Sequence, residues 1–125
     1  PMSSGGPFNF GFLEEFGVPL RRVKAGETLF RAGEPGDVML LVIEGKIDIR
    51  VGEATVETLG LHGIAGEMSL IDEAPRSATA IAATAGEVAL IDRETFLELV
   101  REVPSFALYV MRILAHRVRR MNPRV

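Results

Sequence analysis

Hydrophobic and polar positions follow three different patterns along the chain. Residues 8–17 (FNFGFLEEFG) place apolar residues close to helical spacing, and Gly17 is typical of a helix end. Residues 20–92 contain short apolar stretches separated by glycine-bearing turns, which is typical of an all-β sandwich or barrel. Residues 92–121 return to helical spacing. The pattern therefore predicts a helix, a small β-barrel and two further helices.

The sharpest strand signal is the alternation in KIDIRV, which places Ile47, Ile49 and Val51 on one face. The first C-terminal helix can begin with Asp92 as its N-cap and must end before Pro104. The second can begin with Pro104 in its first turn and run to about Met121. Its apolar residues form one stripe: Phe106, Val110, Ile113, Leu114, Val118 and Met121.

The length of 125 residues indicates one domain. We assign residues 1–7 to a flexible leader or a cloning remnant, because a proline precedes Met2, which is a plausible native start. Residues 8–125 form the single domain, with the barrel at about 20–91 and the C-terminal helices at about 92–121.

The amino-acid composition reduces the number of functional classes to which the chain could belong. Apolar residues make up 47% and charged residues 25%, as in a soluble globular protein, and the net charge of −3 gives no sign of a nucleic-acid surface. The chain has no cysteine, and its two histidines lack metal-ligand spacing. No apolar run approaches the ~18 residues of a membrane span, and no signal peptide is visible. We expect a cytoplasmic protein without a metal or other cofactor.

The segment GEMSLIDEAPRSATA, residues 66–80, concentrates the polar chemistry. A short helical turn after Gly66 would leave its first N–H groups free to bind an anion. Arg76 could donate two parallel hydrogen bonds to a phosphate, and Pro75 restricts the backbone just before it. Ser77 adds a hydroxyl and an N–H group.

Glu67 has two readings. A simple phosphate site would avoid a carboxylate, but a ligand with both an anion and a sugar hydroxyl needs an acceptor as well as donors. Glu67 could then accept from a ribose hydroxyl while Arg76 holds the phosphate. In the other reading, the two residues form a structural salt bridge at a turn, which contributes only ~0–1 kcal/mol.

These residues resemble the phosphate-binding cassette of cyclic nucleotide-binding domains, in which a glycine–glutamate pair and a short helix precede a proline–arginine pair. The register holds from Gly66 to Leu70 and from Pro75 to Thr79. The resemblance extends to the glycine-bearing turns before the cassette and to the helices after the barrel. One departure is Ala65, where the family usually has phenylalanine.

The resemblance implies an eight-stranded jelly-roll barrel that binds cyclic AMP or cyclic GMP. It implies that Glu67 accepts the ribose hydroxyl, that Arg76 neutralises the phosphate, and that Gly66 and the backbone of Met68, Ser69 and Ser77 complete the ligand contacts. By position, Ile49, Val56 and Leu59 are candidates for packing on the purine, or are ordinary barrel core. Arg117 could stack on the base, as residues of the last helix often do in this family, or extend past the apolar stripe to water.

The sequence shows no nucleophile–base pair, so we expect a sensor and not an enzyme. Ligand binding would reposition the C-terminal helices. We favour cyclic AMP over cyclic GMP, although Ser77 could also reach a guanine amino group. Two alternatives remain: a barrel that has lost nucleotide binding and serves as a protein-interaction module, and an enzyme of the same shape. The C-terminal helix could pair with a second copy or another protein; no nucleic acid is expected.

Overall fold

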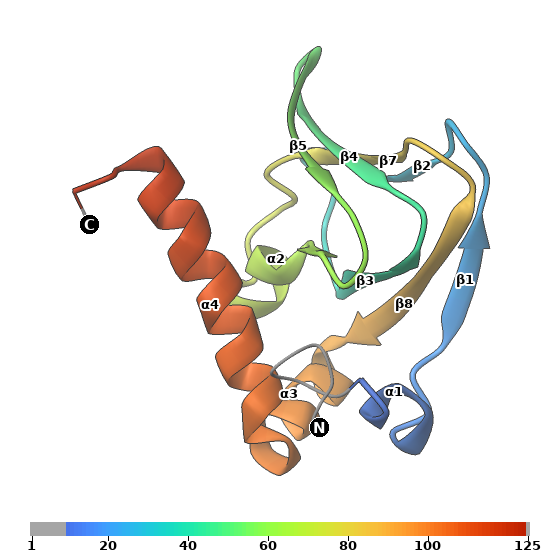
Figure 1. Ribbon diagram of the computed structural model, residues 1–125, viewed down its shortest axis with the longest axis vertical. Helices are drawn as coiled ribbons and strands as arrows, with labels where there is room; N and C mark the ends of the chain where they lie inside the picture. The colour runs from blue at the N-terminus through green and yellow to red at the C-terminus, as the bar shows by residue number, and fades with distance from the viewer. Residues whose placement is uncertain (1–9, 125) are drawn as a thin grey trace.

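The computed structural model describes residues 10–124, which fold into eight strands and four helices (Figure 1). The strands form two four-stranded antiparallel sheets, with orders β1-β8-β3-β6 and β2-β7-β4-β5. This confirms the mainly β fold with flanking helices. The strands are β1 (Leu20–Val23), β2 (Thr28–Phe30), β3 (Val38–Glu44), β4 (Ile47–Val51), β5 (Ala54–Leu59), β6 (Ile64–Ala65), β7 (Thr79–Ala82) and β8 (Gly86–Asp92). The helices are α1 (Phe12–Glu15), α2 (Glu67–Asp72), α3 (Arg93–Glu102) and α4 (Pro104–Met121).

Strand β3 is apolar from Val38 to Ile43, and its central residues are buried on both faces of the sheet. Its residues Leu40 and Val42 belong to the core between the two sheets. Met39 and Leu41 point to the opposite face, where they pack in a second core against helices α1, α3 and α4. The first sheet therefore separates the two cores. The second sheet packs on one of its faces, and the helices pack on the other.

The C-terminal helices begin where the sequence predicted. The Asp92 side chain accepts a hydrogen bond of 2.8 Å from the backbone N–H of Thr95, and Pro104 lies in the first turn of α4. The apolar stripe of α4 is only partly covered. Phe106 and Val110 are buried, whereas the side chains of Val118 and Met121 are 45% and 84% exposed. The last turns of α4 thus extend past the apolar core.

One local prediction needs correction. The N-terminal helix is shorter than the pattern of residues 8–17 suggested: α1 contains four residues, and Phe8 lies outside the described residues. Such a short helix gains few backbone hydrogen bonds, and its place is held mainly by Phe12 in the core. In β4, Ile47 is buried and Ile49 is half-buried, whereas Val51, the last residue before the hairpin turn, is exposed.

Replacing Phe106 by alanine should lower the free energy of unfolding by about 3–5 kcal/mol, because Phe106 is fully buried and contacts the rings of Phe12 and Phe96 edge to face. Urea unfolding followed by circular dichroism measures this change. Leu108→Ala, at a half-exposed position of the same helix, is the matched control and should change stability by less than about 0.5 kcal/mol. Equal losses in both variants would contradict the assignment of the core.

Candidate functional site

The candidate site begins at the junction between β6 and α2. Gly66 has a φ of 84°, a left-handed conformation that glycine adopts without strain. A Cβ atom at this position would lie 2.5 Å from Nη1 of Arg76. The glycine that precedes the cassette helix is therefore needed for two reasons: it turns the chain into α2, and it leaves room for a guanidinium.

Arg76 is buried, with only 8% of the residue exposed. Its Nη1 donates to the carbonyl of Gly66 at 3.1 Å, and its Nη2 donates to the carbonyl of Val38 at 2.7 Å. The guanidinium also lies over the ring of Phe30, with Cζ 4.1 Å from the ring centroid. Its Nε is buried and has no hydrogen-bond partner. Neutral groups thus hold the cation in place, and its Nε–H group is left without a partner.

Glu67, the first residue of α2, is also buried, with 3% exposed. Its Oε2 accepts a hydrogen bond of 3.1 Å from Nη1 of Arg117 on α4. Its Oε1 is buried without a partner. The ion pairs found among residues 10–124 do not include one between Glu67 and Arg76. The reading in which these two residues form a structural salt bridge is therefore wrong.

The electrostatics of Arg76 follow from this arrangement. Burial lowers the pKa of the guanidinium from its usual range, and the carboxylates of Asp37, Glu34 and Glu67 act in the opposite direction. Arginine stays protonated in proteins, so the site contains a desolvated positive charge without a contacting carboxylate. An anion beside Arg76 would compensate that charge.

The turn between β2 and β3 packs directly on Arg76. The backbone N–H of Arg76 donates to the carbonyl of Glu34, and that of Gly33 donates to the carbonyl of Arg76, both at 2.8 Å. A Cβ atom at Gly36 would lie 2.6 Å from the Cβ of Ser69 and 2.7 Å from Cζ of Arg76. We did not predict that Gly36, Phe30 or the Val38 carbonyl takes part in the site. The glycines of this turn were visible in the sequence, but their contact with Arg76 was not.

The other predicted cassette residues lie around these two. Ser69 is buried on α2, whereas Met68 and Ser77 are exposed. Ala65, the departure from the family pattern, is buried in the core between the sheets. The structure thus brings Gly66, Glu67 and Arg76 together. The roles of the backbone groups of Met68, Ser69 and Ser77 stay predictions.

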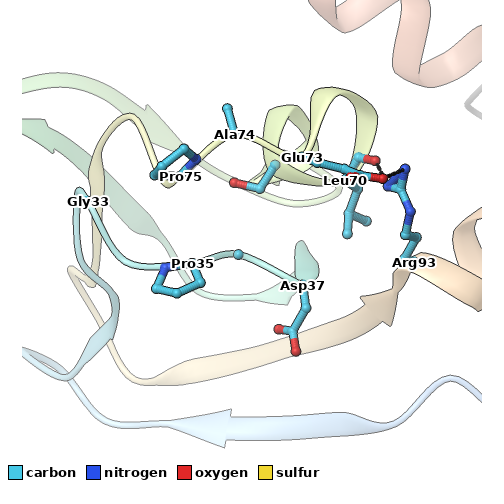
Figure 2. A pocket seen from close by; sticks show the side chains of 10 residues that line it. Gly33, Pro35, Asp37, Leu70, Glu73, Ala74, Pro75 and Arg93 are labelled. Atoms are coloured by element: carbon cyan, nitrogen blue, oxygen red, sulfur yellow. Dashed lines mark hydrogen bonds and ion pairs between the residues drawn. The ribbon is translucent and has the colours of Figure 1, made fainter.

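The far end of α2 contacts α3. Figure 2 shows Arg93, the first residue of α3, which donates from Nη1 to the carbonyl of Leu70. Its Nη2 also lies 2.7 Å from the carboxylate of Glu73, the residue that follows α2. These residues border a cleft of about 270 Å³ against the β2–β3 turn. Sequence reasoning missed Arg93, because an arginine at a helix start gives no distinctive signal.

Arg117 reaches the barrel from α4, and Nη2 donates to the carbonyl of Ile64 at 2.7 Å. It lines a cavity of about 250 Å³ together with Leu59, one of the predicted base contacts. Ile49 is half-buried and packs against the core between the sheets, whereas Val56 is 55% exposed. Arg117 and Leu59 are therefore brought together, Ile49 and Val56 do not line this cavity, and the base contacts of all four stay predictions.

Within residues 10–124, no group of three or more histidine or acidic side chains is arranged to hold a metal ion. In the same part of the chain, no helix combines the length and the apolar character that crossing a membrane requires.

Comparison with known proteins identifies the family. A sequence profile of the cyclic nucleotide-binding domain matches residues 20–103. The chain belongs to the cyclic nucleotide-binding domain family. Within this family, it is 37% identical over 99 residues to the cyclic AMP receptor protein of Thermus thermophilus. It is 32% identical over 102 residues to a CRP-like cAMP-activated global transcriptional regulator of Mycobacterium tuberculosis.

These alignments cover 75% and 78% of this chain but 46% of each relative, so this cyclic nucleotide-binding domain spans about half the length of the curated relatives it matches. The fold agrees with the same family. The crystal structure of the Thermus thermophilus catabolite activator protein superimposes with a TM-score of 0.80 at 31% identity, and the match covers 90% of this chain and 55% of that one.

Replacing Gly36 by alanine should weaken cyclic-nucleotide binding by about tenfold or more, equivalent to about 1.4 kcal/mol, because the new methyl group would displace the guanidinium of Arg76. Calorimetric titration with cyclic AMP measures the effect. Pro35→Ala is the control, since it alters an exposed position of the same turn. Normal affinity in a folded Gly36→Ala protein would show that the position of Arg76 does not determine binding.

Proposed function

We propose that this chain is a sensor domain that binds cyclic AMP, or cyclic GMP, and that couples binding to the position of its C-terminal helices. The observation that carries the proposal is a pair of buried polar atoms without partners, Oε1 of Glu67 and Nε of Arg76. Such atoms are rare in folded proteins because each is costly to desolvate. Oε1 of Glu67 is an acceptor, which a ribose hydroxyl requires. Nε of Arg76 is a donor, which a phosphate requires.

The charges of the site support the same assignment. Arg76 would bind the cyclic phosphate through charge-assisted hydrogen bonds. Glu67 would accept from the ribose 2′-hydroxyl through Oε1, which Arg117 leaves open by bonding to Oε2. Arg117 also compensates the negative charge of Glu67, so an anionic ligand can approach a carboxylate with less repulsion.

The remaining ligand contacts follow the family's pattern. Gly66 and the backbone N–H groups of Met68, Ser69 and Ser77 would complete the phosphate contacts. The base would lie toward the cavity that Leu59 and Arg117 both line. The predicted contacts of Ile49 and Val56 with the base have less support, since neither residue lines that cavity.

We infer a regulatory role and not a catalytic one. The two relatives compared above are named a receptor protein and a transcriptional regulator, and both names include cyclic AMP. Cyclic AMP is therefore our first candidate and cyclic GMP the second. Binding would shift α2, which contacts α4 through Glu67 and α3 through the Leu70 carbonyl. A cytoplasmic location stays a prediction.

The output surface we propose is the outer part of α4. Met111, Val118 and Met121 are exposed apolar residues of this helix. A second copy of the chain or a partner protein could cover them, and their position would change when α4 moves. We assign no nucleic-acid contact to this chain.

Calorimetric titration of nucleotide-free protein with cyclic AMP, and then with cyclic GMP, tests the function directly. We expect micromolar or tighter binding of one of them, about −8 kcal/mol or better. The protein must first be stripped of nucleotide that co-purifies. Absence of heat together with an unchanged melting temperature would instead favour the interaction module that has lost nucleotide binding.

Arg76→Ala should weaken cyclic AMP binding by about 2–5 kcal/mol, because it removes the cation from a desolvated anion site. Arg31→Ala is the matched control: Arg31 is exposed on the turn that packs on Arg76, and its loss should change affinity little. The same titrations compare the two variants with the unmodified chain. Equal affinity of Arg76→Ala and Arg31→Ala would make the assignment of the cassette wrong.

Glu67→Ala should cost less affinity than Arg76→Ala, but it should abolish the preference for cyclic AMP over its 2′-deoxy analogue. The lost interaction is the one between the carboxylate and the 2′-hydroxyl, so only the ligand that carries the hydroxyl is affected by it. Glu73→Ala removes an exposed carboxylate just beyond the other end of α2 and should preserve the preference. A preference that survives in Glu67→Ala would assign the ribose to another residue.

A further inference from the structure

The last turns of α4 are attached to the barrel by charged groups rather than by apolar packing. Val118 and Met121 face solvent, whereas Arg117 and Arg120 both reach Glu57 on β5. Nε of Arg117 lies 3.3 Å from Oε1 of Glu57, and Nη2 of Arg120 lies 3.6 Å from the same oxygen. Figure 1 shows α4 running past α2 and away from the sheets toward its C-terminal end. Together with the hydrogen bonds of Arg117 to Glu67 and to the Ile64 carbonyl, these ion pairs bring this half of the helix back to the barrel.

Glu57 is an unusual residue for its position. It pairs with Ile49 in the β4–β5 ladder, and Leu59, two residues on, pairs with the buried Ile47. Since alternate residues of a strand share a face, Glu57 lies on the same side as Leu59, the side that faces the core between the sheets. Only 24% of its side chain is exposed. A carboxylate in this place costs desolvation energy unless it is paired.

A single guanidinium, that of Arg117, lies between two carboxylates. Its Nη1 donates to Glu67, while its Nε faces Glu57 with the geometry of an ion pair but without a hydrogen bond. Arg120 adds a second positive charge on the side of Glu57. The four residues Glu57, Glu67, Arg117 and Arg120 form a cluster with no net charge, and we call it the α4 cluster.

The two carboxylates of the α4 cluster differ in what else they can bind. Glu67 has one oxygen without a partner, so it can serve a ligand and Arg117 together. Glu57 contacts only α4 in the ion pairs found within residues 10–124. Glu57 therefore acts together with Glu67 and the carbonyl of Ile64 to place the Arg117 guanidinium, and Arg117 in turn orients the Glu67 carboxylate.

We propose that Glu57 is a positioning residue: through Arg117 it holds the C-terminal turns of α4 against the barrel and keeps Oε1 of Glu67 available for the ribose hydroxyl. The part that concerns the hydroxyl rests on the proposed nucleotide-binding function, whereas the part that concerns α4 does not. Side chains of β5, α2 and α4 thus connect the proposed ribose site to α4. Ligand binding to Glu67 is transmitted to α4 through the guanidinium of Arg117.

The test uses the full chain with Glu57→Gln, which keeps the size of the side chain and removes its charge. Glu53→Gln is the matched control, because it makes the same charge change at an exposed position in the turn of the same hairpin. Hydrogen exchange without ligand should show residues 113–121 exchanging about tenfold faster in Glu57→Gln than in the unmodified chain, and no change in Glu53→Gln. The melting temperature of each variant reports whether the barrel is intact.

Titration supplies the second readout. Glu57→Gln should lose about tenfold in affinity for cyclic AMP and less for the 2′-deoxy analogue, so that the preference between them shrinks. In an Arg117→Met, Arg120→Met background, Glu57→Gln should have no further effect on either the preference or the exchange of α4, because both of its partners are gone. This non-additivity separates a positioning role from simple loss of stability.

Three outcomes would overturn the proposal: unchanged α4 exchange in Glu57→Gln, an equal effect of Glu53→Gln, or an effect of Glu57→Gln that persists when both Arg117 and Arg120 are replaced by methionine. If the unmodified chain binds neither nucleotide, the proposed function fails, and the exchange of residues 113–121 still decides whether Glu57 holds α4.

Discussion

Burial of one guanidinium determines how the rest of the site is built. Arg76 donates to carbonyls of Gly66 and Val38, and these residues come from two different parts of the barrel. Its backbone also pairs with the β2–β3 turn. Three segments therefore converge on one side chain, and two of them need glycine because a Cβ at Gly36 or Gly66 would overlap the guanidinium. The cost of burying the charge is offset by backbone dipoles and the ring of Phe30.

Much of this organisation could be read from the sequence because it depends on local signals. Asp92 and Pro104 mark helix starts through their own backbone chemistry. The grouping of Gly66, Glu67 and Arg76 was predictable because they lie within one short segment, which also carries the resemblance to the family.

The remaining features depend on contacts between distant parts of the chain. The carbonyl of Val38 has no side-chain signature, and Glu57 resembles any other charged residue of a hairpin until its register with Ile49 is known. The exposure of Val118 and Met121 could not be predicted either. Helical spacing shows which residues of α4 share a face, but it does not show how far the apolar core extends along that face. Periodicity in the sequence describes one helix or strand at a time, whereas these features depend on contacts between two of them.

The division of α4 into a buried first half and a charged second half has a consequence for how this domain can evolve. Changes at Phe106 or Val110 affect the core that supports the barrel, so these positions are constrained by stability. Positions such as Val118 and Met121 lie outside both cores, and their substitution has little cost for the fold. Substitutions at the end of the helix can therefore accumulate without loss of the fold, whereas substitutions at Phe106 or Val110 cannot.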